Sequence, residues 1–158
     1  IEACLVGSEM CIRDRGINIK YATPIGFEPD ADIVSRAVAM ASENGSSIVS
    51  SNDPVEAVSD AGVVYTDVFV SMGEESLDGK MDAFDGFQIN EELVSHADSD
   101  YLFMHCLPAH RGEEVTNGVI DSKNSVVFDQ AENRMWAQMS LLTRMCNEAA
   151  WHTYNELY

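Results

Sequence analysis

Short apolar runs alternate with amphipathic stretches along most of the chain. Period-two alternation and apolar runs predict strands at 17–22, 48–49, 62–66, 101–104 and 125–128. Apolar side chains at helical spacing predict helices at 29–43, 54–58, 90–97 and 131–154. The runs at 62–66 and 101–104 are mostly apolar and do not alternate, which predicts buried strands. Strands that alternate with helices are typical of an α/β fold with a parallel sheet flanked by helices.

Capping residues support the predicted helix boundaries. Pro29-Asp30 precedes the first helix, and Asn44-Gly45 follows it as a C-cap. Asn52 or Asp53 caps the second helix, and Pro54 occupies its first turn. Asn90 stands in the same capping position before the third helix.

The first fifteen residues do not share this pattern, and the chain does not begin with Met. The string CLVGSEMCIRDR, residues 4–15, resembles translated sequencing-adapter read-through. We therefore expect 1–15 to be a non-native leader and the chain to begin inside a longer protein. An ordinary variable segment is the alternative, and resequencing the source DNA across the Arg15–Gly16 junction distinguishes the two.

The composition excludes several classes of partner. Nine Lys and Arg oppose 27 Asp and Glu among 158 residues, so the formal net charge is −18 at pH 7. This charge argues against binding to nucleic acid or to anionic lipid, and no apolar run approaches the roughly 18 residues of a membrane span. A small anion in a locally basic pocket remains compatible with it.

The cysteines predict neither a zinc site nor a disulfide framework. No two of them form a C-x-x-C motif, and their spacing is wide and irregular. We expect reduced thiols in a cytosolic protein at all four positions, namely Cys4, Cys11, Cys106 and Cys146.

Three predicted strands are each followed by a segment with unusual polar residues. These segments are Asp67 to Gly73, His105 to Pro108, and Glu132 to Arg134. Ligands of open α/β sheets bind beyond the carboxyl ends of the strands, so the three segments predict a binding site there.

The segment that begins at His105 places a thiol beside an imidazole. Neighbours along an extended chain point to opposite sides, so His105 is poorly placed to activate Cys106 as a nucleophile. A thiol that lines a ligand pocket fits better, and a buried, inert cysteine is the alternative. The Leu107-Pro108 bond is a candidate for the cis form, and His110 reads as a surface residue.

The other two segments offer groups for an amino acid and an anion. Asp67 can hold an ammonium group, while Ser71 and the backbone amides near Gly73 can hold a carboxylate; a capped turn is the alternative. Arg134 can neutralise a phosphate or an oxyanion, with a salt bridge to Glu132 as the alternative. The acidic residues between 74 and 85 read as a solvated face, because EF-hand spacing is absent.

The same segments strongly resemble ornithine carbamoyltransferases, in order and in spacing. The resemblance extends from residue 16 to about residue 150, over the second domain of that family. Its Ser-Met-Gly loop resembles the ornithine branch of the transcarbamylases. The motifs that carry it are Asp67-Val-Phe-Val-Ser-Met-Gly-Glu, Phe103-Met-His-Cys-Leu-Pro-Ala-His-Arg-Gly-Glu-Glu-Val, Phe128-Asp-Gln-Ala-Glu-Asn-Arg134, Gly16-Ile-Asn-Ile-Lys-Tyr-Ala-Thr-Pro and Asn52-Asp-Pro-Val-Glu-Ala-Val.

The resemblance implies transfer of the carbamoyl group of carbamoyl phosphate to the δ-amine of ornithine, giving citrulline and phosphate. It assigns Asp67 to the α-ammonium group of ornithine, and Cys106 to a place beside the attacking amine. Neither a metal nor an organic cofactor is implied. The full set of implied site residues is Asp67, Ser71 and Met72 for ornithine, and Cys106, Leu107 and Arg134 for carbamoyl phosphate.

The resemblance also implies a two-part organisation. Residues 16–129 correspond to an ornithine-binding α/β domain, Rossmann-like in fold, and 130–158 to a helix that packs on a carbamoyl phosphate domain absent from this chain. The whole enzyme is expected to be a cytoplasmic homotrimer of arginine metabolism, with this part alone inactive. Two positions depart from the family pattern: Phe69 replaces a usual Trp, and Trp136 a common His.

Two other functions remain open from the sequence. A putrescine or N-acetylornithine carbamoyltransferase keeps the reaction and changes the acceptor, although Asp67 with the Ser-Met-Gly loop favours a free α-amino acid. A non-catalytic module that binds an amino acid is the second alternative.

Overall fold

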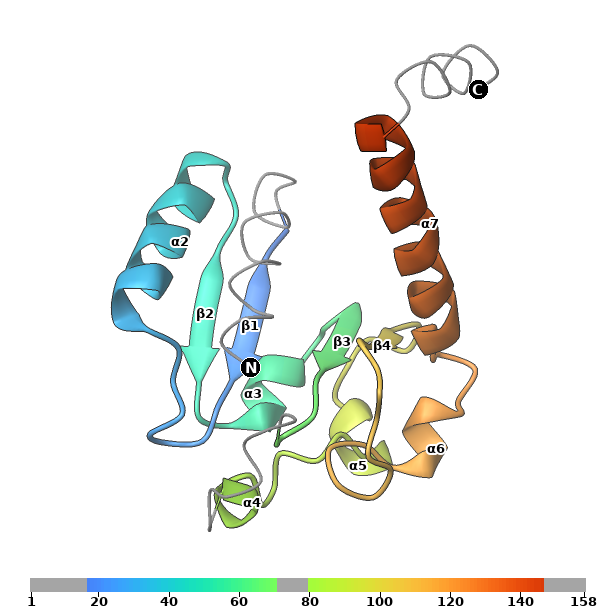
Figure 1. The fold of residues 1–158 in the computed structure, drawn as a ribbon. Coiled ribbons are helices and arrows are strands. Elements are labelled where there is room, and N and C mark those ends of the chain that lie inside the picture. Colours follow the sequence, from blue (N-terminus) through green and yellow to red (C-terminus); the bar gives the residue numbers. More distant parts are fainter. Residues whose placement is uncertain (1–16, 71–79, 147–158) are drawn as a thin grey trace.

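The computed structural model describes residues 17–70 and 80–146 (Figure 1). It begins with a βαβ unit made of β1 (Ile19–Ala22), α2 (Ala31–Glu43) and β2 (Ile48–Ser51). The two strands are parallel and in register from Ile19↔Ile48 to Ala22↔Ser51. The predicted leader, 1–15, lies outside the described residues.

The caps of α2 agree with the sequence prediction. The Asp30 carboxylate accepts hydrogen bonds from the backbone N–H groups of Asp32 and Ile33, at 2.9 and 3.2 Å. Asn44 is the C-cap, and Gly45 follows with a left-handed φ of 70°. These contacts satisfy amide groups at the start of the helix and let the chain turn back into β2.

A short helix, α3 (Pro54–Val58), follows β2 and packs against β1, β2 and the later helix α5. Asp53 is its N-cap and accepts from the N–H of Val55 at 2.8 Å. At its other end, the Lys20 ammonium group on β1 donates to the Ser59 carbonyl at 2.6 Å. The first strand and this helix are thereby joined by a polar contact as well as by packing.

The second half of the chain holds another pair of parallel strands. The elements are β3 (Val63–Thr66), α4 (Lys80–Ala83), α5 (Glu91–Val94), β4 (Leu102–His105) and α6 (Asn117–Ile120). The strands run in register from Val63↔Leu102 to Thr66↔His105. Asn90 caps α5 as predicted, but that helix ends at Val94, earlier than the sequence pattern suggested.

The core lies on one face of the second strand pair. Phe103 is fully buried there, in a cluster completed by Val58, Val64, Ile89, Leu93, Val94, Tyr101, Val115, Val119, Ile120 and Val127. On the other face Val63 and Leu102 stay 53% and 43% exposed. The prediction that both runs are buried strands is therefore right for one face only, because no described element covers the other.

The predicted strand at 125–128 is wrong. Only Ser125 pairs, in an isolated parallel bridge with Phe103, and helix α7 (Val127–Cys146) begins two residues later. The helix starts early because its first residues already make helical bonds, such as Gln130 N–H to the Val126 carbonyl at 2.9 Å. No Gly or Pro interrupts the sequence from there to Cys146.

Helix α7 begins beside β4 and extends away from the rest of the described chain (Figure 1). From residue 131 to residue 146 every side chain on it is exposed. The large apolar side chains among them are Met135, Trp136, Met139, Leu141, Leu142 and Met145. None of the described helices combines the length and the apolar composition that a bilayer-spanning segment requires.

Candidate functional site

The carboxyl ends of β3 and β4 bring two predicted site residues to one edge. Thr66 pairs with His105 at the end of the ladder, so the next residues, Asp67 and Cys106, leave neighbouring strands at the same edge. Both residues are half-buried. The register therefore places both residues beyond the carboxyl ends of parallel strands, where ligands of open α/β sheets bind.

Asp67 is partly engaged by its own backbone. One carboxylate oxygen accepts from the N–H of Val68 at 2.8 Å, which is the capped-turn geometry considered as an alternative. The other oxygen has no hydrogen-bond partner among the described residues and can receive a ligand's ammonium group. Ser71 and Met72, the other two residues predicted to bind ornithine, lie outside the described residues.

Phe69 follows Asp67 and anchors the segment. It is 7% exposed and stacks on Phe84 with ring centroids 4.6 Å apart. Phe84 in turn contacts Phe27 and Phe87 edge-on, at 5.4 and 6.0 Å. The aromatic position that departs from the family pattern is thus filled by a ring that packs well.

The turn after β4 has an unusual backbone. The Leu107–Pro108 bond is cis, as considered from the sequence, and Leu107 has a φ of 57°. A left-handed conformation is unfavourable for a residue with a side chain, by about 1–2 kcal/mol. The N–H of Leu107 donates to Nδ1 of His105 at 2.9 Å, which helps to hold this conformation.

A buried pair of side chains, His105 and Glu114, stabilises the turn after β4. Nε2 of His105 lies 3.1 Å from Oε1 of Glu114, and both side chains are fully buried. Since Nδ1 accepts from Leu107, the ring proton resides on Nε2 and is donated to the carboxylate. Both ring nitrogens are therefore engaged away from Cys106, in agreement with the expectation that His105 does not activate that thiol.

Glu114 holds a second part of the same loop. Its Oε1 also accepts from the backbone N–H of His110 at 2.6 Å, whereas Oε2 has no hydrogen-bond partner. Glu114 was not among the predicted site residues, and the burial that distinguishes it from its neighbour Glu113 is a feature of the folded chain. The His110 side chain is half exposed, which agrees with its reading as a surface residue.

Arg134 lies on α7, within the span predicted to be helical from residue 131 onward. It is exposed on α7 and forms no ion pair with another described residue, so the alternative of a bridge to Glu132 is not realised. Glu132 instead accepts from the indole N–H of Trp136 at 3.1 Å. The guanidinium group remains available for an anion.

Arg111, in the loop after β4, is a second candidate to bind an anion, but its guanidinium group is already engaged by other side chains. Its guanidinium donates to both oxygens of Asp121, at 2.5 and 2.8 Å, and to the Asn117 side chain at 2.9 Å. This contact lowers the pKa of the Asp121 carboxyl and raises that of Arg111. Arg111 is therefore committed to a structural pair, which leaves Arg134 as the better candidate for phosphate.

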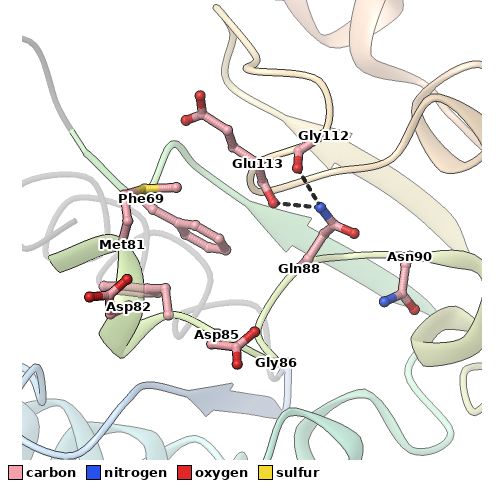
Figure 2. A pocket seen from close by; sticks show the side chains of 10 residues that line it. Phe69, Met81, Asp82, Asp85, Gly86, Gln88, Asn90, Gly112 and Glu113 are labelled. Atoms are coloured by element: carbon pink, nitrogen blue, oxygen red, sulfur yellow. Dashed lines mark hydrogen bonds between the residues drawn. The ribbon is translucent and has the colours of Figure 1, made fainter. Parts of the chain in front are cut away.

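An open hollow of about 530 Å³ lies beside Phe69 (Figure 2). The side chain of Gln88 lines this hollow, and its amide group donates to the carbonyls of Gly112 and Glu113, at 2.8 and 2.9 Å. Asp82 and Asp85 lie at its rim and are exposed, as the prediction of a solvated acidic face requires.

Three side chains of the loop after β4 could hold a cation. Ligand atoms of His110, Glu113 and Glu114 lie within 4.8 Å of one another. The bonds of Glu114 to His105 and to the His110 backbone already account for its position, so this arrangement needs no ion to explain it.

Comparison with known proteins identifies the family. Residues 8–145 match the family model described as "Aspartate/ornithine carbamoyltransferase, Asp/Orn binding domain". The catabolic ornithine carbamoyltransferase of Thermoplasma acidophilum is 56% identical over 131 residues, which are 82% of this chain and 43% of that protein. This chain therefore spans less than half the length of the curated relatives it matches.

Solved structures agree. The ornithine carbamoyltransferase of Pyrococcus furiosus superposes with a TM-score of 0.81 at 50% identity, over 87% of this chain and 44% of that one. An acetylornithine transcarbamylase complexed with acetylcitrulline gives a TM-score of 0.72 at 25% identity, over 84% and 41%. The chain belongs to the aspartate/ornithine carbamoyltransferase family and carries its Asp/Orn-binding domain.

Proposed function

We propose that this chain is the ornithine-binding part of an ornithine carbamoyltransferase, which transfers the carbamoyl group of carbamoyl phosphate to the δ-amine of ornithine. The observation that carries the proposal is the register of β3 and β4, which brings Asp67 and Cys106 to one edge. Relatives more than 50% identical to this chain are named ornithine carbamoyltransferases, which supports ornithine over aspartate as the acceptor.

The roles of the residues follow from the chemistry. Asp67 binds the α-ammonium group of ornithine, and Ser71 and Met72 complete that site. The δ-amine attacks the carbonyl carbon held beside Cys106 and Leu107; the new C–N bond forms, the C–O bond to phosphate breaks and the amine loses a proton. Such a reaction depends on orientation and on fixed positive charge, so no metal or organic cofactor enters the proposal.

Arg134 supplies the positive charge that this chain can offer. Its guanidinium binds carbamoyl phosphate through the phosphate oxygens, because planar N–H donors match them well. This side chain is exposed on α7 and has no ion-pair partner among residues 17–70 and 80–146, which supports the assignment.

The proposal includes a division of the chain into residues 16–129, the ornithine-binding domain, and 130–158, a helix that packs on a carbamoyl phosphate domain. The exposed apolar side chains of α7 support this division, since a single helix rarely leaves so much apolar surface in water. The family resemblance adds a cytoplasmic homotrimer. Light scattering during size-exclusion chromatography tests the trimer.

A hybrid enzyme tests the proposed function. In it, residues 17–158 of this chain replace the matching segment of the Pyrococcus furiosus ornithine carbamoyltransferase, and the parent enzyme is the control. We expect citrulline from ornithine and little product from N-acetylornithine or putrescine. Product from either of these in preference to ornithine contradicts the proposed acceptor.

The chain by itself provides the second part of the test. We expect no citrulline from residues 1–158 given both substrates, because most of the carbamoyl phosphate site is proposed to lie outside this chain. Citrulline formation by the chain alone contradicts the proposed division of the site. Failure of ornithine to bind to the hybrid enzyme argues for a different class of ligand.

A further inference from the structure

The side chain of Gln130 takes the place of a backbone acceptor at the end of β4. The ladder between β4 and the next segment runs from Phe103 N–H to the Asn124 carbonyl and from Val126 N–H to the Phe103 carbonyl. In a parallel ladder the next donor, the N–H of His105, would pair with the carbonyl of Val126. That carbonyl instead accepts from Gln130 N–H, because α7 has begun. Oε1 of Gln130 accepts the His105 N–H, at 3.0 Å.

This bond is the first in a connected series. The ring of the same His105 accepts from the Leu107 N–H at 2.9 Å and donates to Glu114, which also holds the His110 backbone. Gln130 therefore fixes the residue from which the Cys106–Leu107 turn departs and whose ring supports the left-handed Leu107.

Gln130 also relates this turn to Arg134. Residues four apart lie on the same face of an α-helix, about 6 Å apart along its axis. A shift of the first turn of α7 against β4 therefore moves Arg134 relative to the Cys106–Leu107 turn. Gln130 makes the side-chain bond that joins these two segments.

We propose that Gln130 is a positioning residue, which holds the carbamoyl-binding turn and the phosphate-binding Arg134 in register through its bond to His105. The roles of Cys106, Leu107 and Arg134 in this statement rest on the proposed function. Gln130 itself touches neither substrate.

Amide hydrogen exchange on residues 1–158 tests the structural part without any substrate. Gln130→Ala removes the acceptor, so exchange at the His105 and Leu107 amides is expected to rise about tenfold, in line with the loss of one part-buried hydrogen bond. Gln130→Glu retains an acceptor oxygen and is expected to restore the protection. Gln138→Ala, an exposed Gln on the same helix, is the matched control and is expected to change neither amide.

Steady-state kinetics of the hybrid enzyme test the functional part. Gln130→Ala is expected to lower kcat about three- to tenfold, the equivalent of one hydrogen bond, while KM for ornithine stays within twofold because Asp67 is untouched. Gln130→Glu is expected to recover most of kcat. Thermal unfolding of each variant separates this effect from a loss of folded protein.

Several outcomes overturn the proposal. Unchanged exchange at His105 and Leu107 in Gln130→Ala shows that the bond does not hold the turn. Raised exchange with unchanged kcat shows that the bond is only structural, and failure of Gln130→Glu to rescue excludes the acceptor as the cause. If the unsubstituted hybrid enzyme makes no citrulline, the proposed function fails, and protection at Leu107 still decides whether Gln130 holds the turn.

Discussion

Replacement of Glu114 by Ala is expected to destabilise the chain more than any other single change at the loop after β4. Oε1 of Glu114 accepts from two donors, Nε2 of His105 and the N–H of His110. The side chain is fully buried, so water cannot replace the carboxylate without rearrangement. Truncation to Ala leaves both donors without a partner.

The magnitude follows from those two bonds. Each buried donor left unsatisfied costs about 1–3 kcal/mol, so two cost about 2–6 kcal/mol. Removal of a buried carboxylate whose Oε2 has no partner recovers part of this cost. We therefore expect a net loss of about 3 kcal/mol for Glu114→Ala, and about 1 kcal/mol for Glu114→Gln, which keeps an acceptor oxygen for both donors.

Urea denaturation of residues 1–158, followed by circular dichroism, measures these losses. Glu113→Ala is the matched control, because Glu113 is the neighbouring acid and its contact with His110 is half exposed. An exposed pair of this kind contributes less than about 1 kcal/mol. The reasoning is refuted if Glu114→Ala costs no more than Glu113→Ala, or if Glu114→Gln costs as much as Glu114→Ala.

Three further predictions concern other parts of the chain. Asp30→Ala removes the N-cap of α2 and is expected to lower the free energy of unfolding by about 1 kcal/mol in urea denaturation. A loss below about 0.3 kcal/mol contradicts a stabilising role of this cap. The Asp121 carboxyl is expected to titrate by NMR below its usual 3.8, so that the stability from its pair with Arg111 is complete above that pH and is lost as pH falls through the lowered pKa. Arg111→Gln should return the midpoint to the usual value, and no change contradicts the pairing. Trp136→Gln should leave the Tm of residues 1–158 nearly unchanged but lower the Tm of the hybrid enzyme; equal effects contradict the proposal that α7 is covered by a further domain.

Local signals in the sequence specified most of the regular elements. Asp30, Asp53 and Asn90 cap the helices they were predicted to cap, because a short polar side chain before an apolar period is a local feature. The prediction of a strand at 125–128 was wrong because a short Val-Val-Phe run fits a strand as well as it fits the first turn of a helix. The outcome depends on the bridge between Phe103 and Ser125 and on the bond from the His105 N–H to Gln130, and neither contact is local in the sequence.

The position of the candidate site could be predicted from the sequence, but the hydrogen bonds that hold its loop in place could not. Asp67 and Cys106 each follow an apolar run, so their place at a strand end could be predicted, and the resemblance added their roles. Glu114 and Gln130 act through bonds to His105, over separations of 9 and 25 residues. Nothing in a single sequence indicates that a Glu or a Gln on a loop or a helix is aimed at a strand end.

The central claim is that this chain supplies the ornithine half of a carbamoyltransferase site, and Asp67 tests it most directly. The measurement is kcat/KM for ornithine in the hybrid enzyme, with and without Asp67→Asn. Loss of the charge that holds the α-ammonium group is expected to lower kcat/KM by about a hundredfold, the equivalent of a charged hydrogen bond of about 3 kcal/mol, while KM for carbamoyl phosphate stays within twofold. Equal kcat/KM values for the two proteins would contradict the claim.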